Sequence, residues 1–311
     1  MTTDLKMGRT EWGLLLLLSV IWGGSFFVSK IALAEIPPFT LVFSRVFLAA
    51  GTLYLIIKIT RQKLGLTLPM IGVFFGMGLL NNLIPFSLIF YGQTQIASGL
   101  ASILNATTPI FTVIVAHALT RDEKINPAKL GGIILGIIGV AVMLWRDMTG
   151  GFNLSVLAML ACLGAALSYA FASVYGRKLR AMDISPLVGA FGQVSATTVM
   201  MLPIMIAVDQ PWTLAVPSLP IIGAILALGL LCTALAYVIF FRILAKGGAT
   251  NISLVALLIP VSAVLLGASF LGERLSWAHL CGMGLIGLGL IVLDGRVFKF
   301  FKPQARICPC N

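Results

Sequence analysis

The chain has 311 residues, of which 59% are hydrophobic and only 10% are charged, and its mean hydropathy is +1.06. A soluble domain of this size needs far more charged surface, so the composition excludes a soluble globular protein. The net charge of +11 would suit a nucleic-acid partner, but the positions of the basic residues argue against one.

Ten apolar runs of about 20 residues follow one another, and a helix of this length crosses a ~30 Å hydrocarbon core. Their ranges are 12–34, 38–60, 69–91, 97–119, 127–145, 154–176, 186–208, 218–241, 248–271 and 276–294. The gaps between them are too short to hold a soluble domain. The sequence therefore predicts an all-α membrane protein with ten transmembrane helices, located in the inner or plasma membrane.

The basic residues orient these ten helices. If the N-terminus is cytoplasmic, 17 of the 21 Lys and Arg residues lie in cytoplasmic segments and 2 lie in external loops. This bias follows the positive-inside rule and predicts that both termini are cytoplasmic. We therefore expect the lipid bilayer, and no nucleic acid, as a partner. Residues 297–311 form a basic cytoplasmic tail, in which Cys308 and Cys310 match a prenylation signal poorly.

The two halves of the chain repeat each other. Aligned residues include Pro69 with Pro220, Gly78 with Gly229 and Pro109 with Pro260 at an offset of 151, Glu123 with Glu273 at 150, and Lys30 with Arg177 at 147. We expect one repeat over 1–148 and a second over 149–296. Each repeat holds five spans, an odd number, so the second is inverted across the membrane. Inverted repeats are typical of transporters that work by alternating access.

Several short motifs resemble a known family. They are IWGGSFFVSK in the first span, Pro38 followed by Arg45 in the second, and the repeated Pro109/Glu123 and Pro260/Glu273 blocks. Over roughly residues 12–294 they resemble the EamA-like family of the drug/metabolite transporter superfamily. The resemblance implies a ten-helix carrier of small metabolites, often amino acids or their derivatives and often moved outward.

Candidate contacts to a substrate begin in the first two spans. Trp22 and Ser25 share a helix face, and aromatic rings with polar tips suit a pocket for an amphipathic metabolite, although they also pack helices. Arg45 lies deep in the second span, where it either counters an anionic group or bonds backbone carbonyls. Lys30 is close enough to the outer surface to extend its amine there as a structural anchor.

Polar residues that occur in only one repeat are the better candidates, because a substrate is not symmetric. Asn81 and Asn82 lie near the middle of the third span, where the second repeat has Cys232 and Thr233. Buried amides are costly unless paired, so these two either bond another helix or face a pocket.

A polar stripe is predicted on one face of the fourth span. Its members are Ser98, Ser102, Asn105, Thr108 and Thr112, spaced by three or four residues. Most of their counterparts in the ninth span are apolar. Ser and Thr can also bond their own helix backbone, so the alternatives are a cavity lining and local bonding.

Two tyrosines and two prolines complete the candidate site. Tyr169 aligns with Trp22, and Tyr237 aligns with Phe86. Pro109 and Pro260 each remove a backbone hydrogen bond at matching places, which predicts either hinges near a binding site or static kinks.

The sequence lacks the residues that several kinds of chemistry require. Every Asp and Glu lies at or beyond the end of a span, and His117, at the inner end of the fourth span, is expected to be packed and neutral. With two His residues and no intramembrane acid, we expect no enzyme activity, no metal site and no cofactor.

These observations favour a membrane carrier for a small neutral or zwitterionic substrate, with amino acids first, and the family resemblance implies outward transport. A drug or organic-cation exporter is the alternative, which the missing mid-membrane carboxylate disfavours. A non-transporting receptor or assembly subunit is the alternative from another class. The sequence is also compatible with a homodimer.

Overall fold

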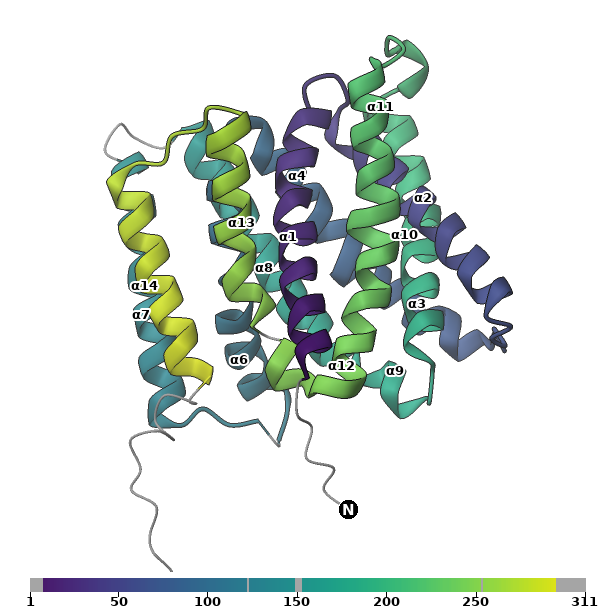
Figure 1. Cartoon of the computed structure of the whole chain (residues 1–311), viewed down its shortest axis with the longest axis horizontal. Coiled ribbons are helices and arrows are strands. Elements are labelled where there is room, and N and C mark those ends of the chain that lie inside the picture. Colours follow the sequence, from purple (N-terminus) through teal and green to yellow (C-terminus); the bar gives the residue numbers. More distant parts are fainter. Residues whose placement is uncertain (1–7, 122, 149–152, 253, 295–311) are drawn as a thin grey trace, which may run out of the picture.

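The computed structural model describes residues 8–121, 123–148, 153–252 and 254–294, and within them it is all-helical (Figure 1). The first half contains α1 (Arg9–Ala32), α2 (Pro38–Ile59), α3 (Leu68–Gly78), η1 (Leu79–Leu83), α4 (Ile84–Gln95), α5 (Ser98–Asn105), α6 (Thr108–Leu119) and α7 (Pro127–Met148). The second half contains α8 (Leu154–Tyr175), α9 (Arg177–Ala181), α10 (Pro186–Val208), η2 (Pro211–Thr213), α11 (Leu219–Leu226), η3 (Ala227–Leu235), α12 (Ala236–Ile252), α13 (Val255–Phe270) and α14 (Trp277–Asp294).

Within the described ranges, seven helical segments are long and apolar enough to cross a membrane. They are Arg9–Ala32, Pro38–Ile59, Leu68–Gln95, Ser98–Leu119, Leu154–Ala181, Pro186–Val208 and Leu219–Leu244. Three shorter apolar helices cover Lys129–Trp145, Val255–Phe270 and Trp277–Leu293. Each of the ten apolar runs in the sequence therefore contains an apolar helical segment, and large side chains such as Leu16, Phe47 and Val199 are exposed on the outside, as a lipid-facing surface requires.

Proline marks where several of these segments begin. Pro38 and Pro186 are the first residues of α2 and α10, and Pro69 and Pro220 are the second residues of α3 and α11. The first turn of a helix has no partner for its N–H groups, so a residue without an N–H costs nothing there. These four positions are two aligned pairs of the predicted repeats.

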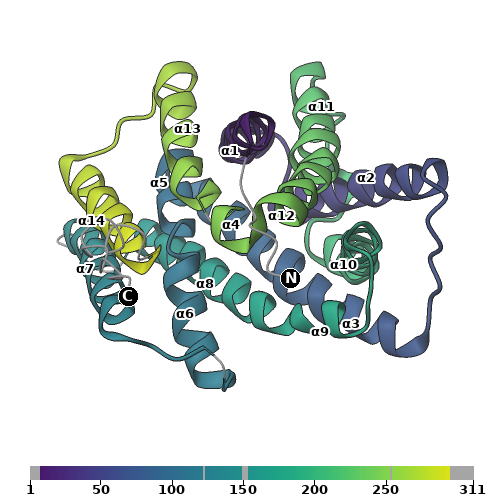
Figure 2. The same ribbon diagram turned by 60° about the horizontal axis from the view of Figure 1, so that its bottom comes forward.

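The helices α7 and α14 form a close pair at one edge of the molecule (Figures 1 and 2). A Cβ at Gly132 would lie 2.6 Å from the Gly289 carbonyl oxygen, and one at Gly139 would lie 2.8 Å from the Gly282 carbonyl oxygen. From the first contact to the second, the residue number rises along α7 and falls along α14. The two helices are therefore antiparallel. At an offset of 150, Gly132 aligns with Gly282 and Gly139 with Gly289. Exchanging each residue for its counterpart in the other half therefore turns one contact into the other, which is the packing that an inverted duplication predicts.

The remaining helices also pack mainly between the halves. Helix α1 contacts α11, η3, α12 and α13 of the second half, while α8 contacts α4, α5 and α6 of the first, and α2 packs on α10. Helices of each half therefore lie directly against helices of the other half. The start of α1 and the end of α14 lie at the same end of the molecule (Figure 1).

Two predicted spans differ from the structure. The fourth span is not one helix, because α5 ends at Asn105 and α6 begins at Thr108, one residue before Pro109. The ninth span was expected to begin near residue 248, but its helix, α13, begins at Val255 and runs through Pro260 without a break. The two aligned prolines therefore have different effects on their helices.

Candidate functional site

Arg45 is a charged side chain buried between the two halves. It lies on α2 and is only 7% exposed. Its Nε donates to Thr233 Oγ1 at 2.8 Å, and its guanidinium carbon lies 4.0 Å from the centre of the Phe86 ring. The phenol groups of Tyr169 and Tyr237 lie near this guanidinium. Among the described residues, no carboxylate forms an ion pair with this cation.

Asn82 is the centre of a neutral hydrogen-bond network. Its side chain is fully buried, its Nδ2 donates to Thr197 Oγ1 at 3.3 Å, and its Oδ1 accepts from the Tyr237 hydroxyl at 3.1 Å. The Thr197 hydroxyl donates in turn to the carbonyl oxygens of Gln193 and Gly78. Asn82 therefore links the third span to α10 and α12.

The neighbouring Asn81 makes a separate contact between the halves. Its Nδ2 donates to Gln193 Oε1 of α10 at 3.0 Å. The structure therefore brings both asparagines onto other helices, the first of the two alternatives that their burial allowed.

The two asparagines lie in a π-helical segment, η1, halfway along their span. The second half has a π-helical segment at the corresponding place, because an offset of 151 puts Leu79–Leu83 onto residues 230–234 of η3. Such segments are frequent at functional sites because they widen the helix and shift its side chains. Hydropathy does not encode the change from α-helical to π-helical hydrogen bonding, so these segments could not be predicted from the apolar pattern.

The hydrogen-bonded residues described above form a polar layer between the two halves. Within this layer, the same close approach of two helix backbones occurs twice. A Cβ at Gly78 would lie 2.8 Å from the Gln193 carbonyl oxygen, and one at Gly229 would lie 3.2 Å from the Arg45 carbonyl oxygen. These contacts correspond between the repeats, since Gly78 aligns with Gly229 and Arg45 with Gln193. One crossing carries a cation and the other a neutral amide, so the layer is symmetric in its backbone and asymmetric in its charge.

The predicted aromatic contacts lie around this layer. Tyr237 on α12 donates its hydroxyl to Asn82, and Tyr169 on α8 lies near Arg45. Trp22 on α1 packs on Phe240, with ring centres 5.6 Å apart, and Ser25 is buried on the same helix.

Most residues of the predicted polar stripe use their hydrogen-bonding groups within the protein. The hydroxyls of Ser102, Thr108 and Thr112 donate to carbonyl oxygens three or four residues earlier in the chain. Ser98 bonds Glu273 through both its N–H and its hydroxyl. The break between α5 and α6 also means that the five residues do not share one uninterrupted helix face.

Asn105 differs from the rest of the stripe. It is the last residue of α5, at the break in the fourth span. Its Oδ1 is buried and has no hydrogen-bond partner among the residues that the structure describes. A buried carbonyl oxygen without a donor is costly, so this atom is the part of the stripe that can accept a bond from a ligand.

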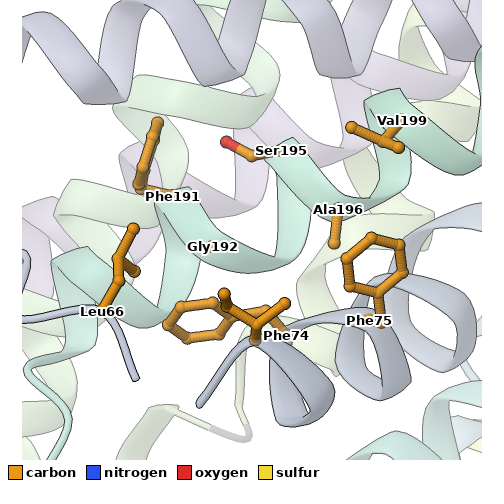
Figure 3. Close-up of a pocket in the computed structure, with 9 residues that line it drawn as sticks. Leu66, Phe74, Phe75, Phe191, Gly192, Ser195, Ala196 and Val199 are labelled. Atoms are coloured by element: carbon orange, nitrogen blue, oxygen red, sulfur yellow. The ribbon is translucent and has the colours of Figure 1, made fainter. Parts of the chain in front are cut away.

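Two cavities lie outside this polar layer. One of about 250 Å³ lies between α3 and α10, and Figure 3 shows its apolar lining, in which Phe74 and Phe75 face Phe191 and Val199. The other, of about 180 Å³, lies between α5, α13 and α14 and includes Pro260. Neither of these two cavities is lined by a predicted substrate contact, although Pro260, a predicted hinge, lines the second.

The expectation for His117 was wrong. Its side chain is exposed at the end of α6, and its Nδ1 accepts from the Ile125 N–H at 3.3 Å. It is therefore not packed within the bundle. Within the part of the chain that the structure describes, no group of three His, Cys, Asp or Glu residues could hold a metal ion.

Four residues of the layer were not among the predicted contacts: Gln193, Thr197, Thr233 and Phe86. Thr233 appeared in the sequence only as the counterpart of Asn82, and Gln193 aligns with Arg45 at an offset of 148. Each of the two aligns with a polar residue of the other repeat. That alignment was the sequence signal from which they could have been predicted.

The family model that matches the chain is the EamA-like transporter family, over residues 11–145 and 156–293. The uncharacterized inner membrane transporter YedA of Escherichia coli K12 is 30% identical, over 93% of this chain and 92% of its own. The probable amino-acid metabolite efflux pump of the same strain is 28% identical, over 92% and 95%. The uncharacterized transporter YoaV of Bacillus subtilis is also 28% identical, over 88% and 93%.

The fold matches a solved protein as well. One crystal structure aligns over 95% of this chain and 100% of its own with a TM-score of 0.64, at 21% identity. The family match covers most of the chain, and the structure has seven helices that are able to span a bilayer. The chain therefore belongs to the EamA-like transporter family and is a multi-pass membrane transporter.

Proposed function

We propose that this protein is an alternating-access exporter of amino acids or of closely related neutral or zwitterionic metabolites. The observation that carries the proposal is the buried cation of Arg45, which has no carboxylate partner among the described residues. Asn105, Phe86 and Trp22 supply the other contacts on which the proposal depends.

A carboxylate of the substrate is the natural complement of Arg45. Taking a guanidinium out of water costs several kcal/mol, and one neutral hydrogen bond and the faces of Phe86 and Phe90 offset only part of this cost. A carboxylate accepts two parallel bonds from a guanidinium, the strongest arrangement that this side chain forms. Binding of the substrate would thus complete an ion pair that the protein leaves open.

Other candidate contacts would suit the remaining parts of an amino acid. Asn105 offers a buried carbonyl oxygen without a donor, which is suited to an ammonium group. The rings of Phe86 and Trp22 offer apolar surface for a side chain and faces that attract a cation. These contacts would not require any acidic residue within the membrane.

The charge distribution disfavours the organic-cation alternative. Every Asp and Glu of the sequence lies at or beyond the end of a predicted span, and the one buried charge of the polar layer is positive. A cationic drug would meet a like charge there, which costs free energy in a site of low dielectric constant. The names of two relatives agree with this preference, since the Escherichia coli and Salmonella typhimurium proteins are called probable amino-acid metabolite efflux pumps.

We further propose ten spans in two inverted repeats, 1–148 and 149–296, with both termini in the cytoplasm. The antiparallel α7–α14 pair and the corresponding contacts of Gly78 and Gly229 support the repeats. The excess of basic residues on one side supports the orientation. A reporter fused after Asn311 should read as cytoplasmic and one inserted at Gly150 as external; the opposite result would overturn this topology.

The test of function is flux in reconstituted vesicles. Purified protein is placed in liposomes and supplied with a radiolabelled amino-acid panel, and separately with a panel of organic cations. The proposal expects saturable flux of at least one amino acid and none of the cations. Flux of cations alone would establish the drug-exporter alternative, and no flux under any gradient would favour a receptor or assembly subunit.

A further inference from the structure

Two pairs of charged residues near the ends of the spans correspond between the repeats. Lys30 aligns with Arg177 at an offset of 147, and Glu123 aligns with Glu273 at 150. Lys30 is in the last turn of α1, and Glu273 is in the α13–α14 connection. Figure 1 shows this connection at one end of the molecule, while α9 and the α6–α7 connection, which carry the other pair, lie at the opposite end.

Lys30 and Glu273 hold the turn between α4 and α5 from both sides. Lys30 Nζ donates to the carbonyl oxygens of Gln93 at 2.5 Å and Ile96 at 3.1 Å, where α4 ends. The carboxylate of Glu273 accepts from Ser98 N at 2.7 Å, from Ser98 Oγ at 2.9 Å and from Gly99 N at 3.2 Å, where α5 begins. Each charge therefore faces the helix terminus of opposite partial charge.

The same end carries two further links between the halves. Asp209 Oδ2, after α10, accepts from the N–H and the hydroxyl of Thr40 in the first turn of α2, at 2.6 and 2.9 Å. Glu35, after α1, accepts from the N–H and the hydroxyl of Ser218, at 2.8 and 2.7 Å. This end is therefore fastened at three places.

The other end is held differently. Arg177 pairs directly with Glu123, and their side chains are 42% and 45% exposed. Solvent screens an exposed ion pair, so this contact contributes far less than a partly buried carboxylate that caps a helix.

One aligned position differs in size between the two ends. Gly267 leaves room for the carboxylate of Glu273, because a Cβ there would overlap Glu273 Oε2 and lie 3.0 Å from Ser98 Oγ. At the offset of 150 that aligns the two glutamates, Gly267 corresponds to His117. The first repeat therefore has a large side chain where the second has space, and its glutamate reaches Arg177 instead.

From these correspondences we propose that Lys30 with Glu273, and Arg177 with Glu123, are the two gates of the transport cycle. In the present state the Lys30–Glu273 gate is closed. Transport requires the Glu273 carboxylate to leave the start of α5 so that this end opens, while the Arg177–Glu123 gate tightens at the other end. The inference rests on the transporter family alone and holds for any substrate.

The test measures one distance at each end by pulsed electron paramagnetic resonance. One spin-label pair replaces the exposed residues Gln95 and Arg274, and the other replaces Arg121 and Arg180. Cys281, Cys308 and Cys310 are changed to serine so that they carry no label. The buried Cys162 and Cys232 are kept in place. The full chain is measured in lipid nanodiscs without substrate.

The variants should act on opposite ends. In Glu273→Gln, the ratio of long to short Gln95–Arg274 distances should rise about tenfold or more, because charge-assisted bonds are lost. Gly267→Ala keeps the carboxylate but displaces it, so it should have the same effect. Glu123→Gln should lengthen only the Arg121–Arg180 distance. Asp183→Asn, an exposed loop variant whose backbone φ of 52° suits Asn, should change neither distance.

The proposal is overturned if Glu273→Gln and Gly267→Ala both leave the Gln95–Arg274 distribution unchanged. It is also overturned if Glu123→Gln and Glu273→Gln affect both ends alike, because the two pairs would then be general stabilising contacts. If Glu273→Gln does not fold, Gly267→Ala decides the question. Since no substrate is added, the outcome is independent of whether amino acids are the cargo.

Discussion

Gly282 packs so closely on Gly139 that a Cβ at Gly282 would lie 2.7 Å from the Gly139 carbonyl oxygen and 2.2 Å from Met143 Cγ. This contact joins α14 to α7, the last helices of the two predicted repeats. A side chain at this position would have to push the helices apart, so the contact gives a direct test of the packing between the halves.

Gly282→Ala should destabilise the folded protein by about 1–3 kcal/mol, the usual cost of adding a methyl group to a closely packed interface. Gly284→Ala on the same helix is the matched control, because a Cβ there meets no atom within 4 Å. It should be neutral or stabilising by up to about 1 kcal/mol, since Ala favours a helix over Gly. Thermal unfolding in detergent distinguishes the two, and an equal effect of both variants would contradict this α7–α14 interface.

Tyr237→Phe should lower the free energy of unfolding by about 1–3 kcal/mol, because it leaves the buried Oδ1 of Asn82 without its donor. Tyr91→Phe is the control, since Tyr91 is exposed and its loss of a hydroxyl should change stability by less than about 0.5 kcal/mol. Both variants are compared by chemical or thermal unfolding. If Tyr237→Phe is as stable as Tyr91→Phe, the bond between Tyr237 and Asn82 does not hold the halves together.

Asn105→Ala should leave stability intact, because it removes a buried oxygen that has no partner and because the aligned residue in α13 is already Ala256. Transport should nevertheless lose roughly 2- to 150-fold in apparent affinity, the cost of one hydrogen bond to substrate, neutral or charged. In the double variant with Ala256→Asn, binding should not return, since the inverted repeat presents that face differently. Lower thermal stability with normal affinity would instead make Asn105 a contact between helices.

Glu35 should give part of the stability a dependence on acid pH. The N–H of Ser218, and then its hydroxyl, hold the pKa of this loop carboxylate below its usual value. A lowered pKa in the folded state stabilises the fold above the unfolded pKa of about 4.3, and this contribution is lost as the pH falls through the lowered folded value.

The thermal midpoints of wild type and Glu35→Gln should therefore differ most above about pH 5 and converge as the pH falls below about 4. Ser218→Ala, which keeps the N–H donor, should show a smaller pH-dependent difference from wild type. A gap between wild type and Glu35→Gln that is constant across this range would show that the carboxylate does not act through its charge.

The helical fold could be predicted because the membrane leaves little choice. Each backbone polar group must be satisfied within its own segment, so every long apolar run becomes a helix. The repeat alignment also placed residues that make the same contact twice, as Gly78 and Gly229 do. The orientation of the termini and the division into domains stay predictions.

Details that depend on local hydrogen bonding could not be predicted. The π-helical segments η1 and η3 arise from shifts in backbone pairing, which apolar periodicity does not record. By contrast, Pro109 did indicate an interruption of the fourth span, whose helix is broken between Asn105 and Thr108. The polar stripe was overestimated for a related reason. Ser102, Thr108 and Thr112 satisfy their hydroxyls on nearby carbonyls, and only Asn105, whose amide oxygen found no donor, keeps an open group.

The central claim is that Arg45 binds the carboxylate of an amino-acid substrate. It is tested most directly by competition in the vesicle assay between a transported amino acid and its methyl ester, which keeps the side chain and the amine. Wild type should prefer the free acid. Arg45→Gln, which introduces the residue found at the aligned position 193, should lose roughly 10- to 150-fold in affinity for the acid and little for the ester. Arg45→Lys should retain part of the preference. If Arg45→Gln weakens acid and ester equally, or wild type does not distinguish them, Arg45 does not bind the carboxylate and the account is contradicted.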